Sequence, residues 1–208
     1  MRAGSFTVGT LMKQLRPCAT LIQAPDTVNA RWMIGKRESP GPAEHCMKTL
    51  FLIRHAKSSW DDIALPDKDR SLNDRGRRDA PKMGKRLAKR NVTPDLILSS
   101  PARRALTTAE IIAKKLDYKL KDIEVDDRLY AGAADDLLKV IQKLGDKLES
   151  VMLFGHNPEL TELAHRLSSE ITHMPTCAVA EFAFNAKSWS NIGKAKVAKV
   201  ALDYPKKS

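Results

Sequence analysis

From Met47 onward, short apolar runs alternate with amphipathic stretches, and this alternation constrains the fold more than any other feature. The run at 48–53 is typical of a strand buried on both faces. Further strands are expected at 95–99, 122–125, 150–154, 178–184 and 195–202, and helices at 74–90, 134–144 and 158–167. Another helix should begin with Ser100 as N-cap and Pro101 as first helical residue. The pattern predicts an α/β protein: a three-layer α/β/α sandwich with a mostly parallel central sheet, in which 195–202 lies at an edge.

Residues 1–46 show no helix or strand period and end in the breaker-rich run 38–42. We therefore predict a poorly ordered extension at 1–46 and a folded domain at 47–208. The extension has six basic and three acidic residues, which weakly resembles an organellar transit peptide. The alternatives are a leader without function and a start assigned too early, with Met47 as the natural start. A cytoplasmic location is expected, or an organellar one if 1–46 is a transit peptide.

The formal charge of +11 over 208 residues favours anionic partners such as phosphate esters, nucleic acids or acidic membrane surfaces. Three cysteines without paired spacing argue against a disulfide framework or a structural zinc site. The basic stretch 75–90 contains interspersed acids and lacks an aromatic platform, so we expect no nucleic-acid partner. No apolar run is long enough to span a bilayer, and no membrane partner is expected.

Cationic and imidazole side chains follow three of the predicted strands. Arg54 and His55 come after the first strand, Arg103 and Arg104 after the second, and His156 after the fourth. In a parallel sheet, ligands bind beyond the carboxyl ends of the strands, so these side chains should meet at one edge. The sequence therefore predicts one site that combines two imidazoles with guanidinium groups.

That combination suits phosphoryl transfer. Arg54 and Arg104 can bind phosphate oxygens bidentately, and a neutral His55 can attack phosphorus and form a phosphohistidine that water then hydrolyses. His156 can stabilise an equatorial oxygen, and the helix that follows Pro101 adds its positive end. Arg103 is the alternative to Arg104 as phosphate ligand.

These motifs resemble the histidine phosphatase (phosphoglycerate mutase-like) superfamily over about 48–184. The stretch 54–56, Arg-His-Ala, stands where the family has its nucleophile motif Arg-His-Gly, and 70–76 resembles the segment that leads into its first helix. The stretch 99–105 resembles the Ser-Pro-x-x-Arg-Ala element, whose phosphate-binding arginine falls on Arg104. Residues 155–156 match the second catalytic histidine. The resemblance also points to Ser58 and Asp61 as substrate-binding residues, and it implies a phosphatase without cofactor or metal.

Within the superfamily, the short chain and the Arg-His-Ala-Lys-Ser stretch look most like SixA-type phosphohistidine phosphatases. Ala56 replaces the usual glycine, so this loop must use an ordinary backbone conformation. The mutase-type glutamate has no clear counterpart, and only Asp126 or Asp127 lies near its place, which makes Asp127 the candidate general acid. Without a strong acid, cleavage of a P–N bond is favoured, because imidazole leaves more easily than an alkoxide.

The resemblance therefore implies a phosphorylated partner, and we expect phosphohistidine on a protein to be the substrate. Two alternatives stay open at this point. One is a phosphatase for small phosphomonoesters, and the other is a non-catalytic module that binds phosphoproteins or nucleic acids. A mutase activity is disfavoured because the chain is short and lacks the clear acid.

Overall fold

The computed structural model describes residues 47–207, and the predicted extension at 1–46 lies outside the described residues. The strands are β1 (Met47–Arg54), β2 (Leu96–Ser99), β3 (Ile123–Val125), β4 (Ser150–Gly155), β5 (Val179–Asn185) and β6 (Val197–Asp203). They form one sheet in the order β3-β2-β4-β1-β5-β6. The first four strands of that order are mutually parallel, whereas β5 and β6 are antiparallel to their neighbours. The predicted mostly parallel sheet is confirmed, with the segment after residue 195 at its edge.

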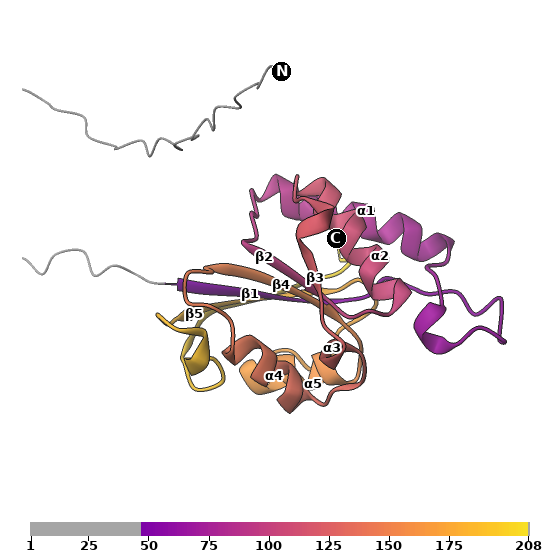
Figure 1. The fold of residues 1–208 in the computed structure, drawn as a ribbon. Helices are drawn as coiled ribbons and strands as arrows, with labels where there is room; N and C mark the ends of the chain where they lie inside the picture. The colour runs from indigo at the N-terminus through magenta and orange to yellow at the C-terminus, as the bar shows by residue number, and fades with distance from the viewer. Residues whose placement is uncertain (1–46, 208) are drawn as a thin grey trace, which may run out of the picture. The chain divides into compact units, whose positions relative to one another are not determined.

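Helices cover both faces of this sheet. They are α1 (Asp74–Lys89), α2 (Arg103–Lys115), α3 (Arg128–Ala131), α4 (Ala134–Gln142) and α5 (Glu159–Leu167), with 3-10 helices η1 (Asp67–Asp69), η2 (Leu120–Asp122) and η3 (Trp189–Asn191). Figure 1 shows α1 and α2 on one face and α3, α4 and α5 on the other. The three-layer α/β/α architecture is therefore confirmed. No helix in the described range 47–207 is both long and apolar enough to cross a membrane.

The apolar run of β1 supplies side chains to two separate cores. Leu50 and Leu52 belong to the cluster under α4 and α5, while Phe51 and Ile53 belong to the cluster under α1 and α2. Successive side chains of a strand point to opposite faces, so a strand covered on both sides must be apolar throughout. This burial fixes β1 in the middle of the sheet and places residue 55 at its edge.

The second helix begins later than the sequence predicted. Arg103 is its first residue and Ala102 is the N-cap, so Pro101 lies in the preceding loop. The backbone N–H of Ser100 donates to the Phe154 carbonyl at 2.9 Å, which continues the pairing of β2 with β4 by one residue. The Ser100 hydroxyl accepts from the Ala102 N–H at 3.2 Å. Ser100 therefore ends the strand and turns the chain toward the helix.

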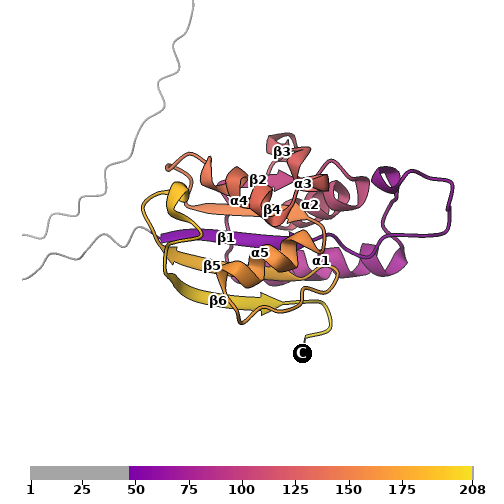
Figure 2. The ribbon, with the colours of Figure 1, turned by 90° about the horizontal axis from the view of Figure 1, so that it is seen from below.

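The segment that joins β1 to α1 runs out beyond the end of the sheet, as Figures 1 and 2 show, and it contains η1. The first residues of this segment, after His55, pack closely against the start of α1. The Asn73 N–H donates to the Lys57 carbonyl at 3.0 Å. A Cβ atom on Gly76 would lie 2.2 Å from the same carbonyl oxygen. This position therefore requires glycine, which lets the helix approach the loop that follows His55.

Candidate active site

Adjacent parallel strands bring the two histidines together. Arg54 of β1 is in register with Gly155 of β4, and the His55 N–H donates to the Gly155 carbonyl at 3.1 Å. The next residues along the two strands are His55 and His156, and their ring centroids are 5.1 Å apart. Both side chains are buried. The sequence prediction that these two imidazoles meet at one sheet edge agrees with this geometry.

The hydrogen bond of His55 fixes which ring nitrogen is free. Nδ1 lies 2.7 Å from the Ala56 carbonyl oxygen, and a carbonyl can only accept, so Nδ1 bears the proton. The lone pair is then on Nε2. Burial lowers the pKa of His55 to about 4, the bond to Ala56 opposes that shift, and the charges of Arg104, Arg54 and Arg70 lower it further. At neutral pH His55 is therefore uncharged, the form a nucleophile needs.

His156 is also uncharged at neutral pH. Burial lowers its pKa to about 3, and the electrostatic interactions with the neighbouring His55 ring, when that ring is protonated, and with Arg104 lower it further. Its Nε2 lies 2.8 Å from the Ser100 hydroxyl. When the Ser100 hydroxyl donates its proton to Nε2, the imidazole proton is on Nδ1. Within residues 47–207, Nδ1 is buried without a hydrogen-bond partner. It is a donor available to an anion.

Of the two neighbouring arginines, Arg104 is buried and Arg103 is exposed at the first position of α2. Arg104 Nη1 donates to the Asp67 carbonyl at 2.5 Å. The turn that bears Arg104 is linked to the nucleophile loop by Thr108, whose hydroxyl donates to the Arg104 carbonyl at 2.6 Å and accepts from the Ala56 N–H at 3.0 Å. The structure thus brings Arg104, and not Arg103, to the histidines.

Arg70 is a third guanidinium group at the site, and the sequence prediction did not include it as a site residue. It is buried, and Nη2 donates to the Ser58 hydroxyl at 2.8 Å while Nε donates to the Ser59 carbonyl at 3.0 Å. Its guanidinium carbon lies 3.2 Å from the centroid of the Trp60 ring. The signal that could have found it is its place at the start of the stretch 70–76, which was interpreted only as a helix entrance.

Asp67 joins two of these arginines. Its carboxylate accepts from Arg70 Nη1 at 2.9 Å, from Arg104 Nη2 at 2.8 Å and from the Tyr130 hydroxyl at 3.0 Å. Partial burial would raise the pKa of this carboxyl, but the hydrogen bonds from Arg104, Tyr130 and Arg70 hold it below its usual value. Asp67 is therefore ionised at neutral pH and cannot donate a proton.

The side chains at the sheet edge enclose a pocket of about 220 Å³. Its lining consists of Arg54, His55, Lys57, Ser58, Trp60, Arg70, Arg104 and Thr176. Arg54 donates through Nη1 to the Met174 carbonyl at 2.9 Å, while its buried Nε has no partner within the described chain. Buried donors without partners are costly unless an anion satisfies them. The predicted residues Arg54, His55, Arg104 and Ser58 thus lie together.

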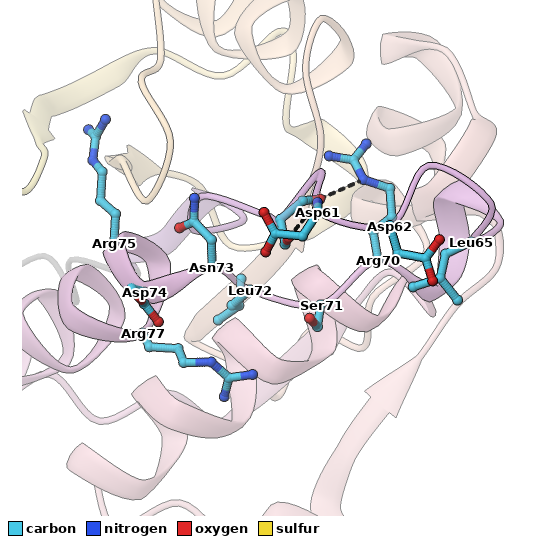
Figure 3. A pocket seen from close by; sticks show the side chains of 11 residues that line it. Asp61, Asp62, Leu65, Arg70, Ser71, Leu72, Asn73, Asp74, Arg75 and Arg77 are labelled. Carbon is cyan, nitrogen blue, oxygen red and sulfur yellow. Dashed lines mark hydrogen bonds between the residues drawn. The ribbon is translucent and has the colours of Figure 1, made fainter.

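Four predicted residues are not among those that line this pocket: His156, Arg103, Asp61 and Asp127. Asp61 lies at a neighbouring hollow of about 570 Å³, which Figure 3 shows along the segment from residue 59 to residue 77. Arg70 lines both cavities. The Asp127 side chain is 87% exposed and pairs with Lys68 at 3.3 Å. The alternative candidate, Asp126, forms an ion pair with Arg128, whose Nε donates to Asp126 Oδ1 at 2.9 Å and to Oδ2 at 3.1 Å. Neither carboxyl is placed to act on a group in the pocket.

A central sheet whose edge combines an uncharged histidine with three guanidinium groups defines an enzyme site for phosphoryl chemistry. Residues 50–136 match the family described as the histidine phosphatase superfamily (branch 1). A protein of Arabidopsis thaliana that is named as uncharacterised and chloroplastic is 33% identical over 71% of this chain and 72% of its own length.

Solved structures agree with that match. A putative phosphohistidine phosphatase SixA from Agrobacterium tumefaciens is 26% identical with a TM-score of 0.62, over 74% of this chain and 97% of that one. The protein histidine phosphatase SixA complexed with tungstate is 25% identical with a TM-score of 0.64, over 76% of this chain and 97% of that one. The chain belongs to the histidine phosphatase superfamily. The reaction class that this membership and these neighbours support is phosphate hydrolysis.

Proposed function

We propose that the protein hydrolyses phosphohistidine on another protein, with His55 as the nucleophile. The observation that carries this proposal is the His55–Ala56 hydrogen bond of 2.7 Å, because it leaves the Nε2 lone pair of a neutral imidazole free in a pocket lined by Arg54, Arg70 and Arg104. The similarity to proteins named as phosphohistidine phosphatases supports the same substrate class.

In the first step, His55 Nε2 forms a bond to phosphorus while the bond from phosphorus to the substrate nitrogen breaks in line with it. The electron pair of the broken bond stays on the leaving imidazole, whose other ring nitrogen bears a proton, so the leaving group is a neutral molecule. In the second step, water attacks the phosphoenzyme, the bond to Nε2 breaks, inorganic phosphate leaves and His55 regains its lone pair. The Nδ1–H group stays hydrogen-bonded to the Ala56 carbonyl throughout and holds the ring in one orientation.

The charges around His55 suit this transfer. Arg54, Arg70 and Arg104 can neutralise charge on the equatorial oxygens, and the free Nδ1–H of His156 can donate to one of them. Because His156 is neutral, it contributes a hydrogen bond and not a full charge. The Ser58 hydroxyl, which Arg70 orients, is a further donor toward a phosphate oxygen.

The leaving group is inferred from the acids at the site. Among residues 47–207, no aspartate or glutamate lines the 220 Å³ pocket, and the nearby Asp67 is ionised. An alkoxide needs a proton from an acid as it leaves, whereas an imidazole that already carries a proton on its other ring nitrogen departs as a neutral molecule. The site therefore suits cleavage of a P–N bond better than that of a phosphomonoester.

The test compares phosphate release from a phosphohistidine peptide and from a sugar phosphate. Wild-type protein should have the higher kcat/KM on the peptide, and His55→Ala should abolish turnover whereas His165→Ala should not. Arg104→Gln should lower kcat/KM at least about a hundredfold, against less than about twofold for Arg103→Gln. Full activity of His55→Ala would refute the mechanism, and a preference for the sugar phosphate would refute the substrate class.

We also propose that residues 1–46 direct the protein to an organelle. The support is their excess of basic over acidic residues and the chloroplastic name of the Arabidopsis relative. A fluorescent protein fused after residue 46 should accumulate in the organelle, and a fusion to residues 47–208 should stay in the cytoplasm. Identical distributions of the two fusions would refute this.

A further inference from the structure

The loop from Trp60 to Leu65 exposes apolar side chains beside the phosphate pocket. Trp60 is 65% exposed, Ile63 91% and Leu65 44%. Among residues 47–207, six large apolar side chains are at least 36% exposed, and three of them fall within these six positions. Single exposed apolar residues need no explanation, but a group of them next to a binding pocket is typical of an interaction surface.

This loop is continuous with the pocket that holds the nucleophile. Trp60 lines the 220 Å³ pocket and Leu65 lines the 570 Å³ hollow, while Arg70 lines both. The Trp60 ring is held under the Arg70 guanidinium, so its position is set before a partner binds. A phosphate group in the pocket must therefore place whatever carries it against the loop.

The charges on the loop select the chemistry of the partner. Asp61 and Asp62 line the hollow together with Leu65, as Figure 3 shows, and neither forms an ion pair with the part of the chain that the structure describes. The Asp61 N–H donates to the Ser59 hydroxyl, and Asp62 Oδ1 accepts from the Ala64 N–H, so the loop is turned with both carboxylates outward. Arg70, Arg75 and Arg77 line the same hollow, but the loop 60–65 itself bears two carboxylates and no basic side chain, so direct contact with the loop favours lysine or arginine over an anionic lipid head group.

We propose that Trp60, Ile63 and Leu65, with Asp61 and Asp62, form the docking surface for the protein that carries the phosphohistidine. This rests on the proposed function and names the partner's chemistry: a polypeptide surface with apolar and basic side chains next to the phosphorylated histidine. The apolar contacts supply affinity, and the two carboxylates select partners by charge. The phosphate alone would be bound by the pocket.

The test uses two phosphohistidine peptides of equal length, one with leucine and lysine next to the phosphohistidine and one with serine and glutamate, together with free phosphohistidine. Wild-type protein should prefer the leucine-lysine peptide by about tenfold or more in kcat/KM. The double variant Ile63→Ser, Leu65→Ser should lose this preference while its kcat/KM on free phosphohistidine stays within about twofold, which also shows that it is folded. The control Leu120→Ser, Val125→Ser changes two exposed apolar side chains outside the loop, 38% and 51% exposed, and should keep the preference.

The outcomes separate this proposal from the proposed function. If the wild type hydrolyses phosphohistidine but does not distinguish the two peptides, or if the Ile63/Leu65 variant still does, the docking surface is refuted and the activity stands. If the wild type hydrolyses none of the three substrates, both proposals fail. Sedimentation of the wild type, but not of the variant, with phosphatidylserine vesicles would assign the loop to a membrane and overturn the protein partner.

Discussion

At the scale of single residues, burial keeps both histidines neutral, and this has a consequence for stability. The pKa of His55 is lowered to about 4 and that of His156 to about 3, mainly by burial, from an ordinary value of 6.5. Below pH 6.5 the unfolded chain takes up protons at these positions while the folded protein does not. The stabilisation is therefore complete above pH 6.5 and is lost as the pH falls toward the folded-state values.

We accordingly expect wild-type protein to lose more stability between pH 7 and pH 5 than His55→Asn, by about 1–2 kcal/mol. Urea unfolding at the two pH values measures this, and His156→Asn should reproduce the difference. Equal losses for the wild type and both variants would show that the two imidazoles are not held neutral.

Thr108 provides a second prediction at this scale. Its hydroxyl bonds both the Arg104 carbonyl and the Ala56 N–H, and Thr108→Val leaves these buried groups without their partner. We expect a loss of about 1–3 kcal/mol in the free energy of unfolding and a lower kcat, because the Ala56 peptide also holds the His55 ring. Thr107 is half-buried on the same helix and forms neither bond, so Thr107→Val is the matched control. Similar effects of the two substitutions in unfolding and kinetic assays would refute the linking role of Thr108.

At the scale of elements, α1 packs so closely against the loop after β1 that one added carbon atom at Gly76 would change their contact. In Gly76→Ala the new Cβ atom would lie 2.2 Å from the Lys57 carbonyl, so the helix or the loop must move. We expect a loss of about 1–3 kcal/mol in thermal or urea unfolding, together with a reduced kcat, because that loop holds His55 and Ser58.

The matched control is Gly145→Ala, where a Cβ atom would meet nothing within 4 Å. It should leave both kcat and the unfolding midpoint close to those of the wild type. If Gly76→Ala behaves like Gly145→Ala, the close approach does not set the position of the nucleophile loop.

The elements also show which features could be predicted from the sequence. The apolar periodicity predicts the strands and the helices that alternate with them. The rule that ligands bind beyond the carboxyl ends of parallel strands predicts His55, Arg54, Arg104 and His156 as site residues. Arg70 and Asp67 could not be found this way, because a loop of irregular backbone brings them to the site and no periodic pattern specifies its path. The start of α2 was also predicted wrongly, since the N-cap pattern of Ser100 and Pro101 did not show that β2–β4 pairing continues through Ser100.

At the scale of the whole molecule, residues 47–207 contain two hydrophobic clusters, one on each face of the sheet, and all the side chains of the pocket. We therefore predict that a chain beginning at Met47 folds and keeps the wild-type kcat. Circular dichroism and phosphate release, measured on this chain and on the full sequence, check the prediction. An unfolded product, or one with a greatly reduced kcat, would place residues 1–46 in the folded unit.

The bonds of Asp67 to Arg70 and Arg104 bear on turnover. Since this carboxylate already neutralises part of the arginine charge, phosphate binding exchanges one anion for another, and its net free energy is a difference between two sets of ion pairs. The same exchange acts in reverse when inorganic phosphate leaves, because Asp67 can return to the arginines as they are released. If Asp67 competes with phosphate for these arginines, we expect weak inhibition by inorganic phosphate and a substrate affinity that comes largely from contacts beyond the phosphate.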